Sequence, residues 1–124
     1  MTGTALVLDE PLSLWGGMDP ETGLIIDARH PQRGESVSGR VLVMRSGRGS
    51  SSSALVLAEA VRAGTAPAAI LLGEPDLILA IGSAVGEELY SVRVPVVVLD
   101  AAELAMLRDG APVEVDGDGA VHTR

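Results

Sequence analysis

The sequence contains no cysteine, no phenylalanine and no lysine. Without cysteine, the chain cannot form a disulfide or offer thiolate ligands to a zinc ion or an iron–sulfur cluster. The two histidines, His30 and His122, stand far apart in the sequence, so we expect no zinc site built on them. A metal cluster, if the function needs one, must therefore come from a partner chain.

Basic charge and long apolar runs are also scarce. The formal net charge is −8, and the arginines are scattered along the chain. Nucleic-acid binding requires clustered cations, so this charge disfavours it. The N-terminus shows no basic region followed by a long apolar stretch, and no apolar run is long enough for a membrane span. We therefore expect a soluble, cytoplasmic protein.

Aliphatic residues dominate what the sequence does contain. The chain has 124 residues, of which 47% are hydrophobic, with a single Trp and a single Tyr. The core must be built from Val, Leu, Ile and Ala, and such a core suits a sheet covered by helices. The length allows one compact domain, and we expect residues 1–124 to form it.

The order of apolar runs and turn residues predicts a β-meander, then alternating strands and helices, then a hairpin. The alternating middle part demands parallel strands with crossover helices, which makes the fold α/β with a mixed sheet. Gly82 and Gly86 lie on one face of a predicted helix and are expected to permit close packing on the sheet. The predicted strands are 4–9 continuing at 12–15, 24–27, 37–44, 68–72, 94–99, 113–115 and 120–122. The predicted helices are 53–63, which Gly64 ends, 76–90, which follows Pro75 as the first helical residue, and 101–108.

The most informative stretch is Ser46-Gly47-Arg48-Gly49-Ser50-Ser51-Ser52-Ser53, here called the serine loop. It follows a predicted strand and opens a predicted helix, so backbone N–H groups and the positive helix end converge there. Arg48 adds a fixed positive charge with a fork of donors, and Gly47 and Gly49 are expected to allow close approach of the backbone. This pattern predicts an anion-binding site at the carboxyl end of the strand, with a serine placed for proton chemistry. The alternative is that Ser50 to Ser53 only cap the helix, with Ser52 or Ser53 as the expected cap.

Three segments together resemble the swivelling small domain, or small subunit, of the aconitase X family. The match runs over about residues 5 to 100, and its joint pattern is more specific than any single piece. The segments are Leu14–Gly23 with Ile25–Asp27 and His30-Pro31; Gly39–Val43 running into Ser46–Ser52; and Thr65–Ile70 leading to Val94–Val97.

The resemblance implies a three-layer β/β/α swivelling domain that serves a dehydratase. In this family a large subunit carries an iron–sulfur cluster and most of the substrate site, and the small unit delivers a serine. The resemblance makes Ser50 the base that removes the α-proton, and it makes Arg48, Gly49, Ser51 and Ser52 substrate contacts. The chain then fits the small-subunit role and is active only with a large subunit. The family's substrates are cis-3-hydroxy-L-proline and a mevalonate phosphate, and the Arg-Gly-Ser-Ser-Ser form of the loop looks more like bacterial members.

Two alternatives to a catalytic subunit remain open at this point. One is a binding module that holds a small anion at Arg48 to Ser52 without chemistry, and the other is a swivel module that only docks a partner. Three further residues have two interpretations each. Asp27 and His30 form either an acid–base pair or a surface hydrogen bond, and Trp15 packs either on the large subunit or in the core.

Overall fold

The structure is a computed structural model that describes residues 1–47 and 51–123. Within these residues, six strands form one sheet in the order β4-β3-β2-β1-β5-β6. The elements are β1 (Thr2–Val7), α1 (Leu14–Gly17), β2 (Val41–Met44), α2 (Ser53–Ala63), β3 (Ala69–Leu72), α3 (Leu77–Tyr90), β4 (Val96–Val98), α4 (Ala101–Ala105), β5 (Pro112–Val115) and β6 (Val121–Thr123).

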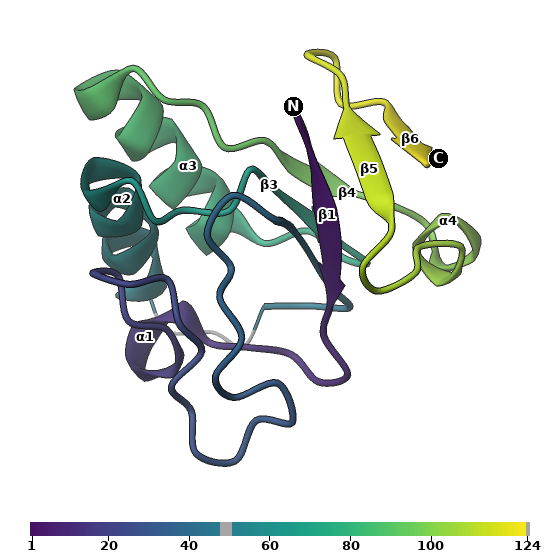
Figure 1. The fold of residues 1–124 in the computed structure, drawn as a ribbon. Helices are drawn as coiled ribbons and strands as arrows, with labels where there is room; N and C mark the ends of the chain where they lie inside the picture. Colours follow the sequence, from purple (N-terminus) through teal and green to yellow (C-terminus); the bar gives the residue numbers. More distant parts are fainter. Residues whose placement is uncertain (48–50, 124) are drawn as a thin grey trace.

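The sheet has a parallel part and an antiparallel part. Strands β1 to β4 are parallel neighbours, with Leu42 paired to Leu6 on one side and to Ile70 on the other. Strand β5 runs antiparallel to β1, and β6 runs antiparallel to β5. Helices α2 and α3 connect the consecutive parallel strands (Figure 1). The predicted α/β fold, with a mixed sheet and crossover helices, is confirmed.

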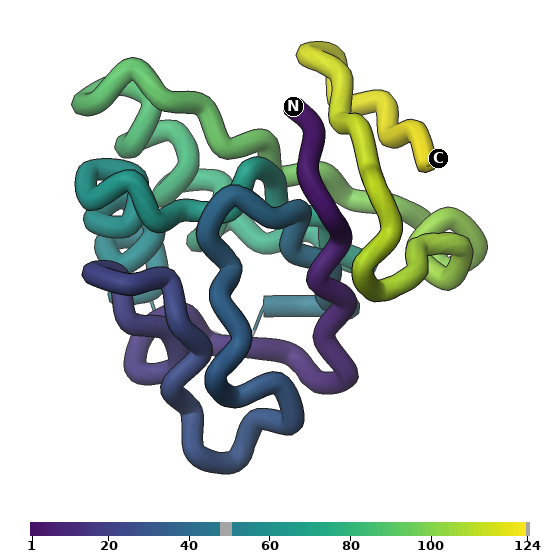
Figure 2. Tube along the Cα trace, viewed as in Figure 1, coloured from purple at the N-terminus to yellow at the C-terminus, as the bar shows by residue number. Residues whose placement is uncertain are grey.

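Two apolar clusters cover the two faces of the sheet. On one face, Leu42 and Ile70 pack with Leu57 and Val61 of α2. On the other face, side chains such as Leu71 pack with residues of β5 and of the segment after α4. The sheet curls so that its two ends approach each other and close this second cluster. Accordingly, a Cβ added at Gly119, in the β5–β6 turn, would lie 3.8 Å from Val97 of β4. Figure 2 shows this hairpin on the side of the molecule opposite α2 and α3, which gives the expected β/β/α layering.

The prediction of a β-meander before β2 is wrong. Strands β1 and β2 are parallel, so their connection, residues 8–40, has to cross the sheet instead of turning back beside it. Predicted strand 12–15 contains one isolated bridge at Leu12 and then the helical turn α1, where Gly16 has a φ of +79°. Predicted strand 24–27 is reduced to isolated bridges at Leu24 and Ile25.

The connection is ordered by burial rather than by a sheet ladder. Five of its apolar side chains fill the cluster under α2, where they are at most 2% exposed. These side chains are Leu12, Leu14, Met18, Ile25 and Val37. The alternation of apolar and polar residues that favours a strand therefore reflects a folded-over loop in contact with the core.

The helix predictions hold with small changes at the ends. Helix α2 spans the predicted residues, and Gly64 ends it with a φ of +77°. Helix α3 begins at Leu77, because Asp76 is its N-cap and Pro75 precedes the cap. Helix α4 ends at Ala105, short of the predicted Arg108.

The two glycines of α3 face α2 and not the sheet, contrary to the prediction. A Cβ added at Gly82 would lie 2.9 Å from the Ala54 carbonyl oxygen, and one at Gly86 would lie 3.0 Å from Val61 Cγ2. The glycines thus allow two neighbouring crossover helices to lie close together, side by side in Figure 1.

Candidate functional site: the serine loop at the carboxyl edge

The serine loop begins where β2 ends. The Arg45 carbonyl accepts a hydrogen bond from Gly73 N–H at 2.9 Å, and Gly47 forms a parallel bridge with Leu12. The described residues on both sides therefore hold the loop at the carboxyl ends of the parallel strands, where α/β proteins bind ligands. The loop starts as predicted.

The predicted base, Ser50, lies outside the described residues, as do the predicted substrate contacts Arg48 and Gly49. Ser51 is exposed and Ser52 is partly buried, and both directly precede α2. The two described members of the predicted substrate-binding set thus stand at the start of this helix. The N–H groups of Ala54 and Leu55 in the first turn already donate to the carbonyls of these two serines. An anion there would therefore meet mainly the positive end of the helix dipole.

The expectation that Ser52 or Ser53 caps α2 is wrong. Ser52 occupies the N-cap position with a φ of −67° and a ψ of −16°, and its side chain makes no capping hydrogen bond. A cap serine needs extended backbone angles to reach the N–H groups ahead of it, and these angles are helical. The Ser53 side chain is buried, and its Oγ accepts a hydrogen bond from Trp15 N–H at 3.2 Å. Ser53 therefore ties α2 to α1.

Gly47 and Asp76 meet at the edge of the loop. The Asp76 carboxylate caps α3 by accepting a hydrogen bond from Leu79 N–H at 3.0 Å. A Cβ built on Gly47 would overlap with the other oxygen of this carboxylate. The sequence predicts close backbone approach at Gly47, but it gives no sign that the neighbour is an acidic cap from a different crossover.

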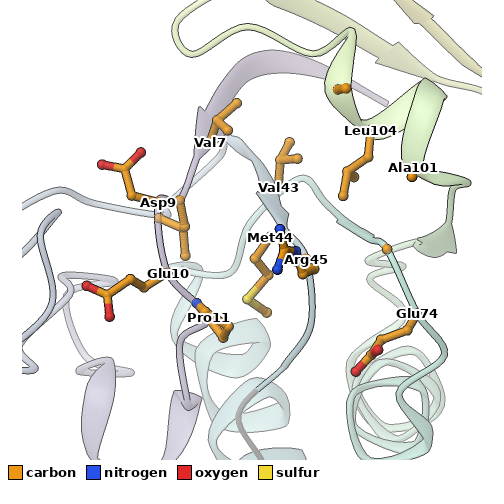
Figure 3. A pocket seen from close by; sticks show the side chains of 13 residues that line it. Val7, Asp9, Glu10, Pro11, Val43, Met44, Arg45, Glu74, Ala101 and Leu104 are labelled. Carbon is orange, nitrogen blue, oxygen red and sulfur yellow. The ribbon is translucent and has the colours of Figure 1, made fainter.

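An open cavity of about 720 Å³ adjoins the loop at the same edge of the sheet. Its walls come from the ends of β1, β2 and β3 and from α4, and Figure 3 shows Leu104 and Ala101 of α4 across from Val7. Arg45 lies near its centre in this view, while the carboxylates of Asp9 and Glu10 point away from it. The charged residues of the lining are Asp9, Glu10, Arg45 and Glu74.

Asp27 and His30 do not act as an acid–base pair in the structure. The Asp27 carboxylate accepts a hydrogen bond from Arg29 N–H at 3.0 Å. His30 is only 5% exposed, and its ring bonds to the Glu10 carbonyl and to Gln32 N–H. Sequence reasoning missed both the burial of His30 and the part played by Gln32, because the His30–Glu10 contact and the contacts of the Gln32 side chain join segments 20 to 25 residues apart.

Large apolar side chains surround the start of α2 and α3. Trp15 is 58% exposed, which excludes it from the core, and Leu55 in the first turn of α2 is 71% exposed. Leu77 and Ile81, four residues apart on α3, are exposed as well. Since both crossover helices begin at the carboxyl edge of the sheet, these side chains lie at the same end of the molecule as the serine loop.

Within residues 1–47 and 51–123, no three potential ligands from His, Cys, Asp and Glu gather into a metal-binding group. The same residues form no helix that is both long and apolar enough to span a membrane. Perturbed pKa values occur in two surface pairs: Asp116 raises the pKa of His122 through a hydrogen bond, and Arg62 lowers the pKa of Glu59.

Fold and loop together define a class of protein: an α/β fold in which a glycine- and serine-rich segment follows a parallel strand at the carboxyl edge of the sheet. More specifically, the chain belongs to the aconitase X swivel domain family, whose model matches residues 1–123.

Relatives with names and structures are similar over most of the chain. Identity is 46% over 98 residues with the cis-3-hydroxy-L-proline dehydratase of Pseudomonas aeruginosa, covering 79% of this chain and 17% of that enzyme. Identity is 36% over 116 residues with the phosphomevalonate dehydratase small subunit of Thermococcus kodakarensis, covering 94% and 81%. The crystal structure of Thermococcus kodakaraensis aconitase X in its holo-form has a TM-score of 0.85 at 33% identity, covering all of this chain and 89% of that one. The chain thus spans about a sixth of the length of the Pseudomonas enzyme.

Proposed function

We propose that residues 1–124 are the swivel unit of an aconitase X-type dehydratase, acting together with a large partner that carries most of the substrate site. The observation that carries the proposal is that the serine loop starts at the carboxyl edge of the sheet. It does so in a chain that the family model matches over nearly its whole length. The dehydratase names of the relatives support the same activity.

In this proposal Ser50 is the base. Dehydration removes a proton from the carbon next to a carboxylate, forms a carbon–carbon double bond and expels hydroxide from the neighbouring carbon. A serine alkoxide needs stabilisation, and both the N-terminus of α2 and the Arg48 guanidinium would favour negative charge beside it. Arg48 would hold the substrate carboxylate, with Gly49, Ser51 and Ser52 lining the rest of the anion site.

The departing hydroxide requires a Lewis acid. This chain has no cysteine, and its described residues gather no metal ligands, so they do not fit an iron–sulfur cluster. Such a cluster would belong to the large partner, where it would supply that Lewis acid. The division of labour assigns proton removal to this chain.

The exposed apolar side chains around the loop support a partner at this end. Trp15, Leu55 and Leu77 are each more than half exposed, and a partner closing over them would bury them. Closure would also exclude water from the serine loop, which strengthens the electrostatic effects on Ser50. We propose that the large partner swings against this face.

For the substrate we propose cis-3-hydroxy-L-proline. Identity is higher with the Pseudomonas hydroxyproline enzyme than with the archaeal phosphomevalonate subunit, although over fewer residues. Acidic residues outnumber basic ones in the described lining of the adjoining cavity, with Asp9, Glu10 and Glu74 against Arg45. Although the Asp9 and Glu10 carboxylates point away from the cavity, their charge makes the potential at this edge more negative. A negative potential disfavours a phosphate dianion more than an amino acid that carries an ammonium group.

Reconstitution with the large partner tests the proposal. We expect the isolated chain to be folded and inactive, and the complex to dehydrate cis-3-hydroxy-L-proline faster than phosphomevalonate in a direct assay of product formation. Turnover by the isolated chain would contradict the division of labour. Turnover of phosphomevalonate alone by the complex would contradict only the substrate assignment, whereas a complex inactive on both would contradict the dehydratase proposal.

A further inference from the structure

His30 is a buried residue that the proposed chemistry does not use. Its Nε2 lies 2.9 Å from the Glu10 carbonyl oxygen, and its Nδ1 accepts a hydrogen bond from Gln32 N–H at 3.0 Å. A ring nitrogen that accepts a hydrogen bond carries no proton, and a nitrogen that faces a carbonyl must donate one. The two contacts therefore define a neutral imidazole protonated at Nε2.

Gln32 holds the same stretch of chain with its side-chain amide. Its Nε2 donates to the Val7 carbonyl at 3.2 Å, and its Oε1 accepts from Asp9 N–H at 3.3 Å. Together with the His30–Glu10 contact, three side-chain hydrogen bonds connect two residues of one loop to the backbone between Val7, the last residue of β1, and Glu10. We call this arrangement the His30–Gln32 clamp.

The clamped stretch contacts the end of β2 and the start of the serine loop. Leu8 N–H donates to the Val43 carbonyl at 2.8 Å, and Leu12 forms the parallel bridge with Gly47. The same stretch, Val7 to Pro11, forms one wall of the cavity in Figure 3. The position of Gly47 therefore depends on backbone that has left the sheet ladder and that the clamp fixes.

We propose that His30 and Gln32 are positioning residues: they hold the segment from Val7 to Leu12 against the end of β2 and so set where the serine loop stands. For catalysis this inference rests on the proposed function, but the mechanical coupling does not. Misplacing a reacting group by about 1 Å costs up to about a hundredfold in rate. Loss of the clamp should therefore lower turnover without removing any group that touches the substrate.

The coupling is tested first on the isolated chain by amide chemical shifts. In His30→Leu and Gln32→Met, the amide signals of Leu12, Gly47 and Ser51 should move, while those of β6 stay in place. His30→Gln places an amide donor near the position of Nε2 and should move them less. The matched control is Val113→Ala, which opens a cavity in the cluster on the other face of the sheet. Unchanged Gly47 and Ser51 signals in Gln32→Met, with the variant folded, would overturn the inference.

The kinetic consequence is tested in the assembled enzyme. We expect kcat to fall about ten- to hundredfold in Gln32→Met and His30→Leu, with KM changed less than threefold and partial recovery in His30→Gln. Val113→Ala should keep kcat. A kcat that falls no further in the clamp variants than in Val113→Ala would overturn the catalytic part. An inactive wild-type complex would instead contradict the proposed function, and the chemical shifts would still decide the coupling.

Discussion

At the residue scale, the tightest constraint described beside the serine loop is the contact between Gly47 and Asp76. One carboxylate oxygen of Asp76 caps α3, and the other occupies the space that a side chain at position 47 would need. Leu79 Cδ1 also lies 3.4 Å from that space. Position 47, the second residue of the serine loop, is therefore glycine because the N-cap of the next crossover helix lies against it.

Gly47→Ala should destabilise the protein by about 1–2 kcal/mol, because the new methyl group displaces the Asp76 cap. Asp76→Ala should cost a similar amount, and the double variant should cost less than the sum. Chemical denaturation of the isolated chain measures all three. Gly117→Ala is the control, since a Cβ there meets nothing within 4 Å. Strictly additive effects at positions 47 and 76 would contradict this account.

The sequence predicted Gly47 as a site of close approach, and it predicted Asp76 only as part of a helix. Local patterns indicate where a turn or a cap lies, but they do not indicate which crossover lies beside which. The error at Ser53 has the same origin. The Ser53 hydroxyl is buried and accepts a hydrogen bond from Trp15 N–H, 38 residues away along the chain. It therefore makes a tertiary contact instead of capping the helix.

At the element scale, the pair α2–α3 sets the spacing of the two crossovers whose first turns flank the loop. Gly82 meets the backbone of Ala54 and the side chain of Leu57, and Gly86 meets Val61. Helix α2 was predicted to the residue because its apolar periodicity, the polar run before it and Gly64 agree. The glycine stripe was assigned to the wrong neighbour, since periodicity reveals a tight face but not what lies against it.

Gly82→Ala tests this helix contact. Replacing glycine by alanine inside a helix gains about 1 kcal/mol in propensity, but overpacking against Ala54 costs about 1–3 kcal/mol. We expect a net loss in the free energy of unfolding of about 1 kcal/mol, measured by thermal and chemical denaturation. Ala80→Gly, at an exposed position of the same helix, should lose about 1 kcal/mol from propensity alone. A Gly82→Ala protein more stable than the wild type would contradict close packing here.

At the scale of the whole molecule, the carboxyl edge of the sheet gathers the features that the proposed function uses. The serine loop, the first turns of α2 and α3, the exposed Trp15 and the open cavity all lie there. The parallel order of the middle strands was predictable, because alternating strands and helices allow little else. The long connection before β2 was not, because its alternating apolar residues fit a strand as well as a loop packed under α2.

The central claim is that this unit contributes a serine as a base and not as a helix cap. Ser50→Ala and Ser53→Ala each remove one hydroxyl oxygen, three residues apart. Ser53 is the matched control, because its hydroxyl has a structural role in tying α2 to α1. Ser53→Ala loses the acceptor for Trp15 N–H, so it should cost about 1 kcal/mol in stability and leave turnover nearly unchanged. Ser50→Ala should leave folding nearly unchanged.

The most direct measurement is therefore the turnover of cis-3-hydroxy-L-proline by the assembled enzyme carrying each substitution. The account predicts that Ser50→Ala lowers kcat by about two to four powers of ten, the usual contribution of a general base, while Ser53→Ala stays near the wild type. Full activity of Ser50→Ala in the complex would contradict the claim and would leave a module that binds an anion without taking its proton.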